Sequence, residues 1–138
     1  MKIINANGLI LGRVASVAAK ASLLGEQVVI YNCEHAAISG TKRNILAKQK
    51  LRYDRGTHVK GPFYERTAHL FVKRTIRGML PYKQEKGRKA FARIKCYQGV
   101  PKALAGQPAE TVKGADASRL TSVSYITVHH LTRHLGHD

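Results

Sequence analysis

Acidic residues are scarce in this sequence, with eight Asp and Glu among 138 residues. They include no close pair of carboxylates of the kind that shares general acid–base work. The sequence also has no GxSxG motif and no Cys–His signature, and Ser39 in the stretch ISG is better explained as a turn or cap residue. Since no residues can be given the roles of base, nucleophile and oxyanion donor, we expect a protein that is not an enzyme.

Cysteine is scarce as well. Cys33 and Cys96 lie far apart and form neither a CxxC pair nor a disulfide framework. Each lies in an apolar run, which predicts two buried free thiols and a reducing, cytoplasmic compartment. The stretch HHLTRH around His130 and His134 lacks the glutamate of HExxH and has no nearby thiol or carboxylate. We therefore expect no metal and no cofactor.

Long hydrophobic runs are missing too. No run approaches the length of about 18 apolar residues that a membrane helix needs, and the start MKIINANGLILGR has neither the apolar core nor the cleavage site of a signal peptide. A hydrophobic content of 43% is nevertheless enough for a core. We expect one domain over residues 1–138, with a surface excursion at about 99–118, where three glycines and two prolines gather.

Positive charge is abundant. The chain has 24 Lys and Arg, a net charge of +16 and a pI near 10.3, whereas a merely soluble surface usually mixes both signs. The segment 42–95 contains 17 basic residues and three acids, while the first 41 residues are nearly neutral. Such a cluster repels itself unless a polyanion faces it, and a phosphate backbone also releases its counterions on binding. We therefore predict a nucleic-acid partner.

The apolar pattern predicts alternating strands and helices. A strand over 2–6, a helix over 13–24 and a continuous apolar strand over 27–33 form a βαβ unit. Further strands are expected over 94–98 and 123–128. Further helices are expected over 42–53, 68–80, 84–93 and the final stretch HHLTRHLG.

The helix over 68–80 has two faces. Val72, Ile76, Met79 and Leu80 fall on one side and are expected to anchor it. Lys73, Arg74 and Arg77 fall nearly opposite, which favours contact with phosphate. Four aromatic residues among the basic ones could stack on unpaired bases, with ordinary packing as the alternative: Tyr53, Phe63, Tyr64 and Tyr82.

The stretch GLILGR lies between a strand and a helix, as phosphate loops do. It lacks the GK[ST] ending of a Walker A loop and the third glycine of a dinucleotide fingerprint. Turn glycines at a helix start explain it better, although Arg13 could still touch a phosphate.

The stretch RTIRGMLPYKQEKGRKAFARIKCYQGVP, residues 74–101, closely resembles the signature region of the large-subunit ribosomal protein thirteen family. LILGRVAS, ISG and KGPFYERT resemble further landmarks of that family in the expected order. The ending SRLTSVSYITVHHLTRHLG is similar to the C-terminal region of archaeal members. One departure is Tyr82, where the family usually has histidine, although the following Lys83 is retained.

The resemblance implies an α/β fold of three α/β/α layers with a four-stranded parallel sheet, a count that the four expected strands match. It implies a non-catalytic protein that binds large-subunit rRNA beside neighbouring ribosomal proteins and supports subunit assembly and translation. No membrane and no small-molecule substrate are expected. By position, the resemblance implies RNA contacts from Arg74, Arg77, Lys83, Lys86, Arg88, Lys60 and Arg66. The charge pattern adds Lys48, Arg52, Arg55, Lys73 and Lys89, and the helix start adds Arg13.

Two other functions stay open at the level of sequence. A free-standing regulator that binds DNA or messenger RNA would fit the charge, although no recognition-helix or RNP-type aromatic pattern is present. A small α/β enzyme that binds nucleotides through GLILGR is the second alternative.

Overall fold

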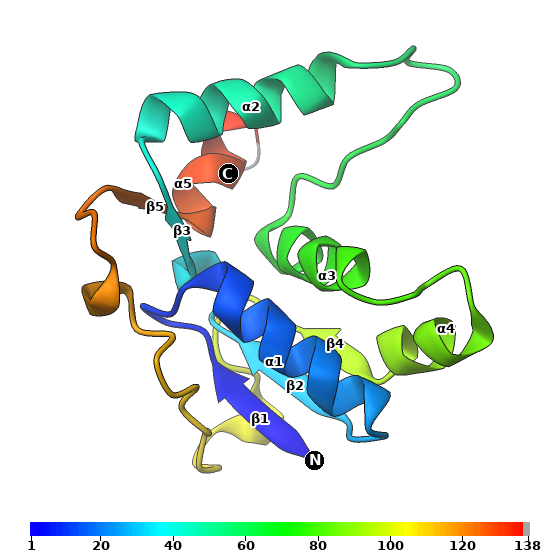
Figure 1. Cartoon of the computed structure of the whole chain (residues 1–138), viewed down its shortest axis with the longest axis vertical. Coiled ribbons are helices and arrows are strands. Elements are labelled where there is room, and N and C mark those ends of the chain that lie inside the picture. The colour runs from blue at the N-terminus through cyan, green and yellow to red at the C-terminus, as the bar shows by residue number, and fades with distance from the viewer. Residues whose placement is uncertain (137–138) are drawn as a thin grey trace.

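The computed structural model describes residues 1–136 and shows five α-helices and five short strands (Figure 1). Every expected helix is present, and its bounds differ from the predicted ones by two residues or fewer. No helix among these residues is long and apolar enough to cross a membrane. The strands are β1 (Lys2–Asn5), β2 (Val28–Tyr31), β3 (Ala37–Ser39), β4 (Ile94–Cys96) and β5 (Tyr125–Thr127), and the helices are α1 (Leu11–Leu23), α2 (Lys42–Asp54), α3 (Ala68–Gly78), α4 (Glu85–Ala92) and α5 (Val128–His134).

The main sheet has three parallel strands in the order β1-β2-β4. Ile4, Ile30 and Cys96 form one row across it. β2 is buried along its whole length, as its continuous apolar sequence predicts. The expected β1–α1–β2 unit is therefore confirmed.

The expectation of a four-stranded parallel sheet is wrong. The predicted strand over 123–128 forms as β5, but it pairs antiparallel with β3 in a separate two-stranded sheet. The free edge of β1 is instead occupied by the excursion, where the Glu110 amide donates to the Ile3 carbonyl over 2.8 Å. The Glu110 carboxylate also lies 3.1 Å from the Lys2 ammonium. The excursion meets this edge as an isolated parallel bridge between Ile4 and Glu110, and not as a further strand of the sheet.

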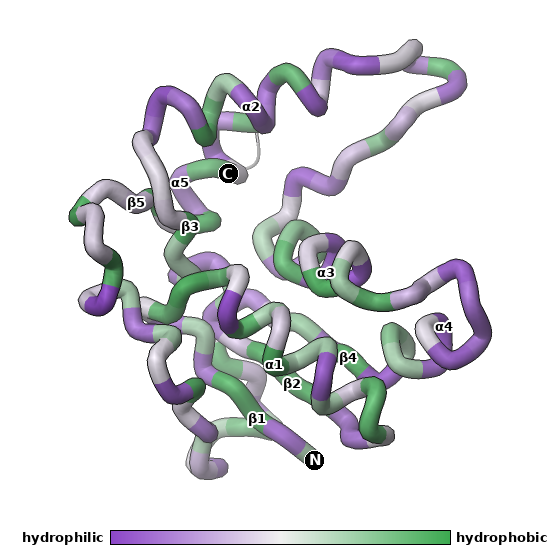
Figure 2. Tube along the Cα trace, in the orientation of Figure 1, coloured by the Kyte–Doolittle hydropathy of each residue, from purple (hydrophilic) through white to green (hydrophobic). Residues whose placement is uncertain are grey.

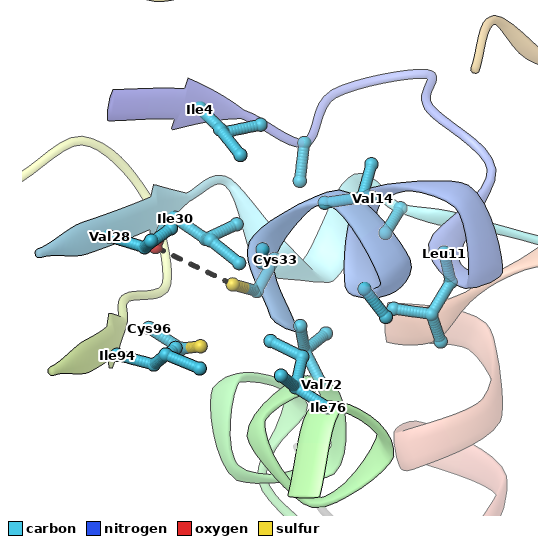
Figure 3. Close-up of a cluster of buried hydrophobic side chains, with 14 of the residues drawn as sticks. Ile4, Leu11, Val14, Val28, Ile30, Cys33, Val72, Ile76, Ile94 and Cys96 are labelled. Atoms are coloured by element: carbon cyan, nitrogen blue, oxygen red, sulfur yellow. Dashed lines mark hydrogen bonds between the residues drawn. The ribbon is translucent and has the colours of Figure 1, made fainter. Parts of the chain in front are cut away.

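The core lies between the main sheet and the helices α1, α3 and α4. Ile30, Ile94 and Cys96 of the sheet lie against Val72 and Ile76 of α3 (Figure 3). On the other face of the sheet the predicted helical layer is not present in the described chain. Residues of the excursion lie there, and Val29, Pro101 and Leu104 line one hollow.

Helix α2 stands away from the main sheet, and residues 55–67 return from it to α3 (Figure 1). It has no buried residue. Its inner side carries the half-buried Ile45, Leu46 and Gln49, and its outer side carries charge. The basic helix α2 and residues 55–67 therefore lie opposite the exposed side of α3 (Figure 1).

Candidate nucleic-acid interface

Hydrophilic residues dominate α2 and the turn before α4, and the loop between α2 and α3 is mixed, as the hydropathy view shows (Figure 2). Of the predicted contact residues, Lys48 and Arg52 lie exposed on α2, and Arg55 follows directly after it. Lys60 and Arg66 lie exposed in the loop. The structure thus keeps these five side chains on one outer segment of the chain, where solvent or a partner can reach them.

An aromatic cluster joins α2, the loop and α3. The Tyr53 hydroxyl donates to the Tyr64 carbonyl, and the two ring centroids lie 6.1 Å apart. The Arg66 Nε donates to the Tyr53 hydroxyl over 3.0 Å. Arg74 lies 4.1 Å above the Tyr64 ring and donates to the Phe63 carbonyl over 3.1 Å. We call these four side chains, Tyr53, Tyr64, Arg66 and Arg74, the Tyr53–Tyr64 cluster.

Helix α3 has the two faces that its sequence predicts. Val72 and Ile76 are fully buried, while Lys73, Arg74 and Arg77 are only half-buried. Lys73 lies 4.9 Å from the Phe91 ring centroid and Arg77 lies 5.1 Å from that of Tyr82. These contacts hold the charged ends of the two side chains over aromatic rings at the molecular surface.

The prediction that Met79 anchors α3 is wrong, since its side chain is 44% exposed. Met79 comes after the last residue of α3, where the helical phase no longer applies. Beside it, Leu23 and Leu24 at the end of α1 line the same hollow. Leu80 instead turns inward and is buried.

The turn at residues 79–84 packs closely against α4, and four more of the predicted contact residues point outward around it. A Cβ on Gly87 would lie 2.1 Å from the Pro81 carbonyl oxygen, so only glycine fits between α4 and the turn. Gly87 is buried as a result. The side chains around it are exposed: Lys83, Lys86, Arg88 and Lys89.

The charge of the central segment is largely uncompensated by the protein. Within residues 1–136, Lys89 is the one basic residue of the segment 42–95 within 4.0 Å of a carboxylate, that of Glu85 at 2.7 Å. This pair is exposed and one helical turn apart, so it contributes little. The other basic residues have no carboxylate partner in the described part of the chain, which leaves a field that attracts polyanions.

Two basic residues have contacts elsewhere. Arg13 lies on α1 and donates to the Gly114 carbonyl of the excursion, outside the central basic segment. Arg93, which was not among the predicted contacts, donates to the Ser22 carbonyl over 3.1 Å and supports packing. The GLILGR amides are also engaged internally, since Gly8 donates to His35 and Ile10 to Ala115.

The contacts between arginine and tyrosine were missed by sequence reasoning. The sequence suggests the tyrosines as stacking surfaces for bases, but Tyr53, Tyr64 and Tyr82 each already have an arginine over the ring. Arg66 and Tyr53 are 13 residues apart, and their meeting depends on the course of the loop rather than on helical spacing. Phe63 is 67% exposed and is the most accessible of the four aromatic residues.

Both cysteines are buried and free, as predicted. A hydrogen bond with Cys96 and burial both raise the pKa of the Cys33 thiol, so this sulfur stays protonated. Within residues 1–136 no three His, Cys, Asp or Glu side chains gather as metal ligands would.

Comparison with known proteins gives one consistent result. The family model described as Ribosomal protein L13 matches residues 1–103. The Large ribosomal subunit protein uL13 of Methanococcoides burtonii is 43% identical over 99% of this chain and 98% of its own length. The protein of the same name from Archaeoglobus fulgidus is 40% identical over 97% of this chain and 86% of its own. That of Methanosarcina barkeri is 42% identical over 99% and 98%.

Proposed function

The chain belongs to the Ribosomal protein L13 family, and from this premise we propose that it is a structural constituent of the large ribosomal subunit. Its relatives carry the name of a large-subunit protein over nearly the full length of the chain. The role is structural rather than catalytic. Large-subunit rRNA and neighbouring proteins of that subunit are its partners.

The rRNA contacts lie on the basic surface formed by α2, residues 55–67, α3 and α4. One observation supports this placement most: the segment 42–95 that forms these elements holds 17 basic residues and three acids, and one of the basic residues is paired in the described chain. Phosphates supply the missing negative charge, and arginine can bind them with two parallel hydrogen bonds. The contact residues are Lys48, Arg52, Arg55, Lys60, Arg66, Lys73, Arg74, Arg77, Lys83, Lys86, Arg88 and Lys89. Arg13, held by the excursion, is a weaker candidate.

Sedimentation of the tagged chain through a sucrose gradient tests the ribosomal role. The wild-type chain should travel with large subunits. A chain that stays at the top of the gradient, while still binding DNA or messenger RNA, would instead support a free-standing regulator.

Two variants of equal charge test the placement of the surface. The site triple variant replaces Lys83, Lys86 and Arg88 with alanine, and the control triple variant replaces the exposed Lys20, Lys113 and Arg119. Each loses three positive charges. The site triple variant should bind an rRNA fragment more weakly than the control triple variant does, and equal losses would argue against this surface.

A further inference from the structure

A groove of about 400 Å³ runs between α2 and α3. It lies within the range of about 300–1,000 Å³ in which proteins hold small ligands. Elements far apart in the sequence form it, because Leu11 of α1 and Ile38 of β3 also line it. The arrangement of α2 away from the sheet leaves this groove open.

The groove combines an apolar interior with a basic rim. Ile38 and Phe71 contribute apolar surface, and both pack against the core cluster. Arg52 and Arg74 contribute positive charge from the two opposite helices. Gln49 and Glu65 add groups that can hydrogen-bond the edge of a planar ligand.

Arg74 is held in position before any ligand arrives. It stacks 4.1 Å above Tyr64 and donates to the Phe63 carbonyl. A guanidinium that is already fixed loses less entropy when it binds phosphate or stacks on a base. Tyr53 and Tyr64 also line the groove, and the Tyr53 side chain is fixed by its hydrogen bond to the Tyr64 carbonyl.

We propose that this groove takes one unpaired nucleotide of the bound RNA, with the base inside and its phosphate at Arg52 and Arg74. This inference rests on the proposed function and adds a site that reads a base rather than the backbone alone. Unpaired bases are what proteins read on RNA, by stacking and by hydrogen bonds to their edges. An apolar peptide would fill the interior but would leave both arginines without a counter-charge, whereas a nucleotide satisfies both features.

Gly78 offers a variant that fills the groove without changing charge. It lines the groove, and a Cβ built there meets no atom within 4 Å. Gly12 is its matched control, because it is also a helical, exposed glycine with open space and does not line the groove. Gly78→Leu and Gly12→Leu therefore make the same chemical change at two places. If Gly78→Leu does not fold, Thr75→Met is the second variant, because Thr75 also lines the groove, one helical turn earlier in α3.

The experiment uses the full chain and the rRNA fragment that it protects from nuclease. A series of fragments is made in which one unpaired nucleotide at a time is abasic, so that the phosphate stays and the base is lost. We expect one position at which the abasic fragment binds the wild-type chain and Gly12→Leu roughly tenfold more weakly, the scale of one base–aromatic stack. Gly78→Leu should bind the intact fragment weakly and show no further loss at that position.

Three results overturn the inference. In the first, no abasic position weakens binding. In the second, the loss at that position is undiminished in Gly78→Leu. In the third, Gly78→Leu changes only incorporation into subunits, as a protein segment in the groove would require. A chain that protects no rRNA at all would overturn the proposed function together with this inference.

Discussion

Arg74 shows how one residue can serve the fold and the interface together. Its guanidinium lies over Tyr64 and donates to the Phe63 carbonyl, so it ties α3 to the loop. The same group remains half-buried at the surface, where phosphate can reach its free N–H groups. A basic side chain that is already ordered gives up less rotamer freedom on binding than a lysine in solvent does.

We expect Arg74→Ala to weaken both stability and RNA binding. Loss of a cation–π contact and of one hydrogen bond to a backbone carbonyl should lower the free energy of unfolding by about 1 kcal/mol. Urea denaturation measures this change. Arg88→Ala is the control, because Arg88 is exposed and loses the same charge. It should weaken RNA binding and leave stability unchanged, and equal stability losses would contradict a structural role for Arg74.

Two helical glycines should respond in opposite ways to the same substitution. Gly87→Ala would place a Cβ 2.1 Å from the Pro81 carbonyl oxygen, and relief of that overlap should destabilise the chain by about 1–3 kcal/mol. Gly78→Ala meets open space and should stabilise α3 by less than the roughly 0.5–1 kcal/mol of a helix interior, because Gly78 is its last residue. Thermal unfolding followed by circular dichroism compares the two variants. A neutral Gly87→Ala would show that α4 can move away from the turn.

Among the elements, the helices and the parallel strands β1, β2 and β4 were predictable, whereas the pairing of β5 was not. The bounds of α3 follow from local signals, a 3.6-residue apolar period and Pro81 shortly after its end. The partner of β5 is set instead by tertiary contacts, since it pairs antiparallel with β3 while Glu110 of the excursion lies beside β1. The Tyr53–Tyr64 cluster was missed for the same reason, because its members meet only through the course of a loop.

Helix α2 should be the least stable helix of the free protein. It has no buried residue, whereas seven residues of α1 are buried. Segments with few buried apolar contacts open at low free energy. We expect hydrogen exchange, read by mass spectrometry, to show fast exchange of the α2 amides in the free chain and strong slowing when rRNA is bound. Exchange in free α2 as slow as in α1 would contradict this view.

For the whole molecule, salt should act on folding and on binding in opposite directions. The free chain carries a net charge of +16, and repulsion among its basic groups disfavours the compact state. Salt screens this repulsion over a Debye length of about 10 Å at 0.1 M, so the unfolding midpoint of the free chain should rise with added NaCl. The same salt competes with the release of counterions from RNA and should weaken the complex.

The salt dependence of RNA binding can be predicted in size as well as in direction. If about eight basic residues meet phosphates, the logarithm of the binding constant should fall against the logarithm of salt with a slope of about −6 to −7. The site triple variant should reduce the size of that slope by about two to three, because each lost phosphate contact removes nearly one. The control triple variant has the same net charge and should keep the wild-type slope. Equal slopes for the two variants would mean that rRNA responds to the total charge of the chain and not to the surface that α2, α3 and α4 present.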